Sequence, residues 1–148
     1  MMMMRILLAA ILATVPAAAA MARESINCVG QNQAYLAHVT EPLEDTTRSY
    51  AQGAVRILIL SAPEPACCGT AVAVLMPDPL DGARICRLLI TDDEQGWGGM
   101  TFGPGAASDD PASGLRVPMT ATVWEGEGFH KEPVTVFVDQ ATGRVHIR

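Results

Sequence analysis

The chain has 148 residues, of which 49% are hydrophobic and 18% are charged, so it is long enough for one domain with its own apolar core. Sixteen Asp and Glu residues outnumber ten Lys and Arg residues, and the formal net charge is −6. An acidic surface repels phosphate backbones and anionic lipids, which argues against nucleic acids and membrane surfaces as partners.

The first segment along the chain, residues 1–20, has the pattern of a secretory signal peptide. Arg5 gives a short basic start, residues 6–15 are an apolar run, and residues 17–20 supply the small side chains that a signal peptidase reads. The apolar run is shorter than the roughly 20 residues of a membrane-spanning helix. We expect cleavage after Ala20, with Ala22 as the alternative. The product, residues 21–148, is then a single exported β-domain, secreted or periplasmic, with no membrane insertion after cleavage.

Period-two alternation of apolar residues dominates the remaining chain and predicts β-strands. The expected strands cover residues 51–60, 70–76, 85–91, 115–124, 134–138 and 145–147, with residues 35–40 as a further candidate. The run at 70–76 is apolar throughout, which indicates burial on both faces. The alternation is cleanest at 115–124, although Pro118 cannot donate a ladder hydrogen bond and predicts an edge strand or a bulge there.

Turn residues separate the expected strands and set the fold class. Residues 139–143 have the composition of a hairpin turn, with Gly143 available for a positive φ. Short strands separated by Gly/Pro turns predict an all-β fold, an antiparallel β-sandwich (Ig-like or related) of about seven strands. The alternative is a small β-barrel with a short helix near residues 83–90, where Ile85, Leu88 and Leu89 have helical spacing.

An even number of cysteines in an exported chain indicates disulfide bonds, and here the four are Cys28, Cys67, Cys68 and Cys86. If residues 70–76 and 85–91 form a hairpin, the 67–68 pair lies about 20 Å beyond Cys86, at ~3.3 Å per residue. A bond between them requires the chain to fold back. We expect Cys28 to bond to Cys67 or Cys68. The alternative is a Cys28–Cys86 bond that leaves the adjacent pair bonded to each other or free.

Residues 96–114 are rich in glycine and proline and predict a long flexible loop. Aromatic side chains in such loops can be presented to a partner, which makes Trp97 and Phe102 candidate contact residues. The alternative is that both side chains fold back over one end of the sheet. Trp124, on the polar face of its expected strand, is a third candidate, and with Trp97 it would form a contact patch.

Signals for catalysis and for metal binding are weak. His130 has Glu125, Glu127 and Glu132 close in sequence, and such a group can bind a metal or act as a general base. The alternative is a solvated residue of a mobile loop. The acidic residues 92–94, with Asp109 or Asp110, leave a loose calcium site open, and His146 is expected to be a solvated strand residue. Nucleophile-elbow, phosphate-loop and C-x2-C motifs are absent. We therefore predict no catalytic residue, no metal ligand and no cofactor.

These observations favour a non-enzymatic exported or periplasmic domain that binds a protein, a peptide or an envelope component through Trp97, Phe102 and Trp124. One alternative is a small hydrolase or metal-dependent enzyme that uses His130 with the nearby carboxylates. A second is a periplasmic metal-ion carrier that uses Cys67 and Cys68. The three hypotheses differ in where the working side chains must meet, which makes the spatial arrangement decisive.

Overall fold

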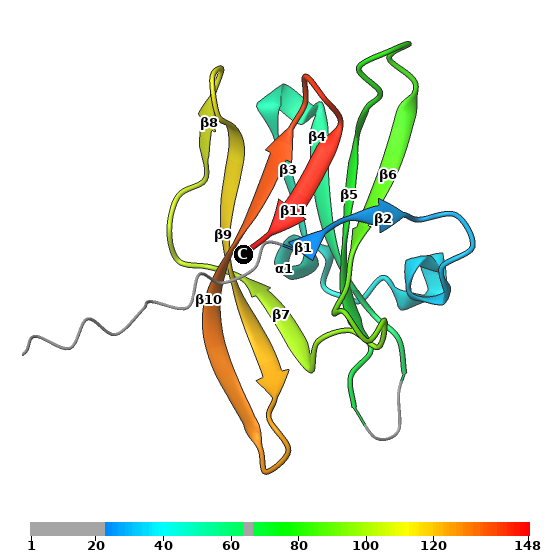
Figure 1. Ribbon diagram of the computed structural model, residues 1–148, viewed down its shortest axis with the longest axis vertical. Helices are drawn as coiled ribbons and strands as arrows, with labels where there is room; N and C mark the ends of the chain where they lie inside the picture. Colours follow the sequence, from blue (N-terminus) through cyan, green and yellow to red (C-terminus); the bar gives the residue numbers. More distant parts are fainter. Residues whose placement is uncertain (1–22, 64–66) are drawn as a thin grey trace, which may run out of the picture.

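The computed structural model describes residues 23–63 and 67–148, so the predicted signal peptide and both candidate cleavage positions, Ala20 and Ala22, lie outside the described residues. Two antiparallel sheets pack face to face, and the predicted all-β sandwich is confirmed (Figure 1). The described residues contain eleven strands where about seven were expected, because several pairings are only two to four residues long.

The first sheet is built on two long neighbouring strands, β9 (Gly114–Trp124) and β10 (Phe129–Asp139). Its strand order is β1-β11-β10-β9-β7, and β8 also pairs with β9. The shorter members are β1 (Arg23–Glu24), β7 (Gly99–Phe102), β8 (Ser108–Asp110) and β11 (Arg144–Ile147). The segment expected to be a long flexible loop thus contains two strands, since the backbone of β9 offers hydrogen-bonding groups that need partners on that side.

Pro118 lies inside the first sheet, in a strand that is paired on both sides, so the expected edge strand is wrong. The proline is tolerated because β7 does not extend as far as Pro118. The last residue of β7, Phe102, is paired with Met119. Only the carbonyl of Pro118 is used on that side, where it accepts a hydrogen bond of 2.9 Å from the backbone of Gly103. The missing N–H therefore costs the sheet no ladder bond.

The second sheet has the order β2-β6-β5-β4-β3. Its strands are β2 (Ile26–Asn27), β3 (Thr47–Tyr50), β4 (Val55–Ser61), β5 (Thr70–Pro77) and β6 (Arg84–Leu89). The alternative helix near residues 83–90 is wrong, because β6 pairs with β5 on one side and with β2 on the other. As predicted, β5 is buried on both faces.

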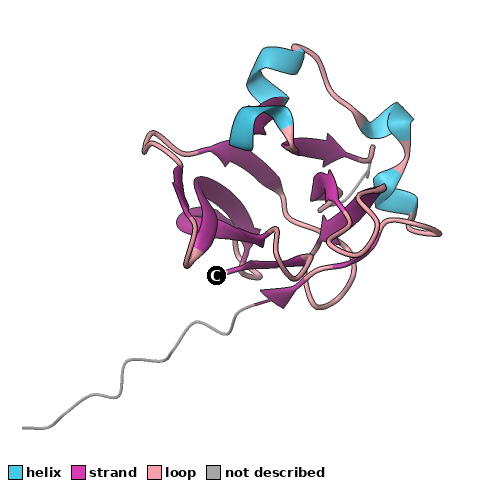
Figure 2. Ribbon diagram, turned by 90° about the horizontal axis from the view of Figure 1, so that it is seen from above, coloured by secondary structure: helices cyan, strands magenta, loops and turns pink. Residues whose placement is uncertain are grey.

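Short helical turns lie outside the strand layers (Figure 2): η1 (Asn32–Ala34), η2 (Leu36–His38), α1 (Leu43–Thr46) and η3 (Ala51–Gly53). The candidate strand at 35–40 is therefore wrong, and only Val39 makes a single bridge, to Leu60. The segment that carries η1 and η2 packs Ala34 and Val39 on a small apolar cluster at Leu60, Ala71, Ala73, Leu88 and Ile90. This cover explains why the second sheet is apolar on both faces.

The main core fills the space between the two sheets, with alternate residues of each strand pointing inward. In β9, Leu115, Val117, Met119 and Ala121 are all 1% exposed or less, as the alternation predicts. The amino-terminal segment links the two layers, because β1 pairs with β11 of the first sheet and β2 pairs with β6 of the second. This crossing places Arg23 at the end of the sandwich where the candidate site lies.

The disulfide bonds join Cys28 to Cys86 and Cys67 to Cys68, so the expected bond from Cys28 to the adjacent pair is wrong. The reason is the position of β2, which runs beside β6 and brings the backbone N–H of Cys28 to 3.4 Å from the carbonyl of Cys86. The two α-carbons are 5.5 Å apart.

Along the part of the chain that the structure describes, no helix has the length and apolar content needed to cross a membrane.

Candidate functional site

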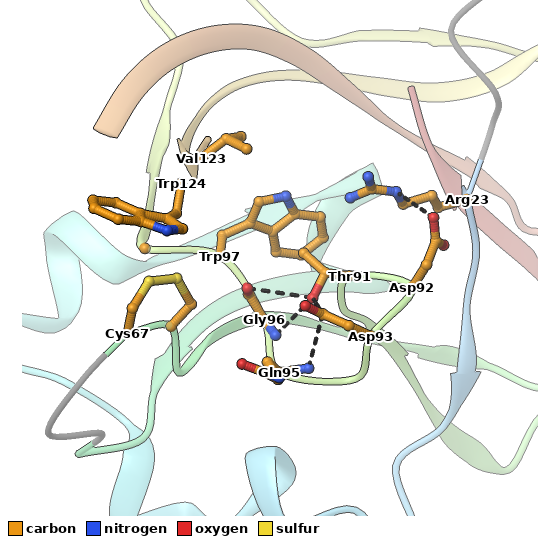
Figure 3. Close-up of a pocket in the computed structure, with 12 residues that line it drawn as sticks. Arg23, Cys67, Thr91, Asp92, Asp93, Gln95, Gly96, Trp97, Val123 and Trp124 are labelled. Carbon is orange, nitrogen blue, oxygen red and sulfur yellow. Dashed lines mark hydrogen bonds and ion pairs between the residues drawn. A yellow bond between two sulfur atoms is a disulfide. The ribbon is translucent and has the colours of Figure 1, made fainter. Parts of the chain in front are cut away.

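A pocket of about 500 Å³ opens at one end of the sandwich and is the candidate functional site (Figure 3). It lies where the turn at residues 91–98 meets the Cys67–Cys68 disulfide, the end of β9 and the start of β1. Its lining comprises Arg23, Cys67, Cys68, Thr91, Asp92, Asp93, Gln95, Gly96, Trp97, Gly98, Val123 and Trp124. The volume lies within the range of small-molecule and side-chain binding pockets.

Local hydrogen bonds hold the turn that forms the floor of this pocket. The Thr91 hydroxyl donates to the Asp93 carboxylate and accepts a bond of 2.7 Å from the backbone N–H of Gly96. The backbone N–H of Gln95 donates to the same carboxylate at 3.2 Å. The bond from the Thr91 hydroxyl, followed by the bond from the Gln95 backbone, lowers the pKa of Asp93 and keeps its carboxylate ionised. The turn is therefore a built element with a fixed shape.

Gly96 lets this turn approach the second sheet closely. Its φ is +103°, and a Cβ there would lie 2.5 Å from the backbone oxygen of Thr70. The next residue, Trp97, exchanges two backbone hydrogen bonds with Thr70, of 2.8 and 3.0 Å. Trp97 is consequently 2% exposed and belongs to the main core, with one part of its indole facing the pocket. The folded-back alternative describes Trp97 correctly.

Trp124 and Phe129 form a half-exposed aromatic pair at the rim of the pocket. They face each other across the β9–β10 hairpin, with ring centroids 5.0 Å apart in an edge-to-face arrangement. Trp124 is 48% exposed and Phe129 54%. The Phe129 ring lies directly on Gly98, where a Cβ would come within 2.5 Å of it. Only glycine at position 98 allows the ring to rest there.

The two ends of the pocket differ in chemistry. Figure 3 shows Trp124 and the Cys67–Cys68 disulfide at one end, the Arg23–Asp92 ion pair at the other, and Trp97 between them. The ion pair has an N–O distance of 3.5 Å, and the Asp92 side chain is 83% exposed. A ligand with an apolar part and a polar or charged part would match this division.

The structure brings two of the three predicted contact residues together and separates the third. Trp97 and Trp124 line the same pocket, as the contact-patch hypothesis requires. Phe102 lies at the far end of β7, packed against the core, with the Arg48 guanidinium 5.0 Å from its ring centre. Sequence reasoning missed Phe129, although its position across a four-residue Glu-Gly-Glu-Gly turn from Trp124 is a signal for a cross-strand pair.

His130 lies between two carboxylates but is not among the residues that line this pocket. Its Nδ1 is 3.6 Å from Glu125 and its Nε2 is 3.8 Å from Glu132, both beyond hydrogen-bond length. His146, expected to be a solvated strand residue, is half-buried. Its ring stacks on the Phe137 ring, with the two ring centres 4.8 Å apart.

The acidic residues proposed for a loose calcium site lie at opposite ends of β9. Asp110 pairs with Gly114, whereas Asp92 and Asp93 line the pocket near Trp124. Asp92 already faces Arg23, and Asp93 holds the turn. Within residues 23–63 and 67–148, no group of three or more His, Cys, Asp or Glu side chains is arranged to hold a metal ion.

Comparisons with protein-family models, with curated proteins and with solved structures gave no match for this chain.

Proposed function

We propose that the protein is a non-enzymatic, exported binding module that captures a protein, a peptide or an envelope component at the pocket beside Trp124. The observation that carries the proposal is the half-exposed Trp124–Phe129 pair at the rim of a pocket of about 500 Å³. Large aromatic rings left in water are costly to solvate, and at protein interfaces such residues supply much of the binding free energy.

The rigidity of the surroundings supports this interpretation. Hydrogen bonds hold the 91–96 turn, backbone bonds join Trp97 to Thr70, and the pair of long strands β9 and β10 carries the two exposed rings. A preformed surface loses little conformational entropy when a ligand binds. The pocket therefore has the properties of a recognition site: an exposed aromatic anchor, a fixed floor and a polar end.

The disulfides support the proposed location. Disulfide bonds form and persist mainly in oxidising compartments, and all four cysteines of this chain are paired. Together with the signal-like pattern of residues 1–20, they favour a secreted or periplasmic protein.

The hydrolase alternative is not carried forward because His130 is not part of the pocket. The metal-carrier alternative is not carried forward because Cys67 and Cys68 are bonded to each other.

The test is capture of a component from the native envelope fraction by the immobilised, unreduced protein. Trp124→Ala removes the exposed indole, and we expect retention of the captured component to fall about tenfold or more, as for an interface hot spot. The matched control is Leu80→Ala in the β5–β6 turn, since Leu80 is a still more exposed apolar side chain, at 94%.

Equal loss in both variants would mean that retention reflects nonspecific apolar adhesion, and the proposal would be wrong. Full retention by Trp124→Ala would contradict it as well. Near-ultraviolet circular dichroism of each variant checks that the fold survives, because Trp97 in the core still gives a signal from packed surroundings when Trp124 is removed.

A further inference from the structure

The outer face of the first sheet carries a cluster of charged and aromatic side chains that the pocket does not use. Arg116 of β9, Phe137 of β10 and His146 of β11 lie side by side across three paired strands. Arg148 follows His146 by two residues and shares its face. We call these four residues the arginine–aromatic cluster.

Both guanidinium groups of the cluster lie over one ring. The guanidinium carbon of Arg148 lies 4.7 Å from the centre of the Phe137 ring, and that of Arg116 lies 5.7 Å from it. The His146 ring is parallel to Phe137, with an interplanar angle of 4°. Nη2 of Arg148 donates to Nε2 of His146 at 3.2 Å. An arginine that lies over an aromatic ring still has N–H groups to offer an anion, and Arg148 uses only one of its own on His146.

The two positive charges have no carboxylate partner among the described residues. Ion pairs in that part of the chain involve other groups, and Arg144, the neighbouring cation, is already held by Glu24 at 2.6 Å. Backbone hydrogen bonds from Ala112 and Ser113 are the main cause of the lowered pKa of Asp110, and Arg116 adds a smaller contribution without forming an ion pair with it. In a protein with a formal net charge of −6, two exposed arginines over one ring form a local concentration of positive charge.

The rest of this face extends the cluster into a track. Residues with the same orientation along β10 run from Phe137 to Phe129, eight residues away, which is about 26 Å at ~3.3 Å per residue. The exposed Trp124–Phe129 pair closes the far end. Between the ends, the outward positions of β9 and β10 hold threonines, prolines and one lysine: Pro118, Thr120, Thr122, Lys131, Pro133 and Thr135. A ligand that reaches both ends must be an extended polymer.

We infer that this face binds an acidic polysaccharide, whose carboxylates meet Arg116 and Arg148 and whose sugar rings lie along β9 and β10. Guanidinium groups bind carboxylates with two parallel hydrogen bonds, and aromatic faces attract the C–H side of a sugar ring. An extended peptide is disfavoured, because β9, β10 and β11 already pair along this stretch and offer no free strand edge. The inference deepens the proposed function by naming the class of envelope component, and it rests on that proposal.

The experiment titrates purified, unreduced protein with alginate oligosaccharides, a polyuronate, and measures affinity by calorimetry at low and moderate salt. Arg116→Gln with Arg148→Gln is expected to weaken binding about tenfold or more. The matched control, Arg56→Gln with Arg84→Gln, removes the same charge from exposed positions of the second sheet and is expected to bind like the wild type. Binding by the wild type is expected to weaken as salt rises.

Neutral dextran, poly-glutamate and anionic phospholipid vesicles are the comparison ligands. Equal affinity for poly-glutamate or for the vesicles would overturn the assignment to a polysaccharide, and unchanged alginate binding by the cluster variant would overturn the site. Absence of alginate binding together with Trp124-dependent capture from the envelope fraction would remove this inference and leave the proposed function standing. Loss of both would remove both.

Discussion

The Cys28–Cys86 bond is the covalent link that constrains this chain most. It joins residues 58 apart in sequence, and in the chain-entropy account closing a loop of that length stabilises the folded state by about 4 kcal/mol. The Cys67–Cys68 bond joins adjacent residues and closes no loop, so the same account gives it less than about 1 kcal/mol. Replacing each pair by alanine should therefore have very unequal effects.

Urea unfolding followed by far-ultraviolet circular dichroism measures the difference. We expect Cys28→Ala with Cys86→Ala to lower the free energy of unfolding by about 4 kcal/mol, and Cys67→Ala with Cys68→Ala to lower it by less than about 1 kcal/mol. Equal losses, or the larger loss for the adjacent pair, would refute the reasoning, because one of the adjacent cysteines would then have to close a long loop.

Two further predictions concern single residues. Gly96→Ala should lower the free energy of unfolding by about 2 kcal/mol or more, because the added Cβ would meet the Thr70 carbonyl and the backbone has a φ of +103°. A Cβ at Gly128 would meet open space, so Gly128→Ala should change the free energy of unfolding by less than about 0.5 kcal/mol in the same urea assay. Burial first, then the Arg148 charge, lowers the pKa of His146 below its ordinary 6.5, so the unfolded state binds the proton more readily. The wild type should accordingly lose stability relative to His146→Phe as the pH falls below about 6.5; parallel pH dependences of the two proteins would contradict that assignment.

The parts of the fold that could be predicted are those that local pattern determines. Strand β9 alternates because one of its faces is buried, and this pattern is visible in the residues themselves. The hairpin at 139–143 forms as expected: the Asp139 carboxylate accepts a bond of 3.0 Å from the backbone of Ala141, and Gly143 has a φ of +72°. Both features depend on residues that are close in sequence.

The parts that could not be predicted depend on long-range pairing. The partner of Cys28 follows from β2 lying beside β6, which no local pattern indicates. The glycine-rich segment after Trp97 becomes strand β7 because the edge of β9 needs a hydrogen-bonding partner. Trp124 could be proposed from its position on a strand. Arg23 and Cys67 reach the same pocket only through pairings that join distant parts of the chain.

The most direct test of the proposed binding site uses the two tryptophans of the chain, which give two indole N–H signals in a ¹⁵N-correlated NMR spectrum. The Trp124→Phe variant assigns them. On addition of the native envelope fraction, the account predicts that the Trp124 signal shifts or broadens strongly and that the Trp97 signal, from a largely buried ring at the same pocket, responds less. Retention of the protein by the envelope fraction with both indole signals unchanged would contradict it, because binding would then use a surface other than this pocket.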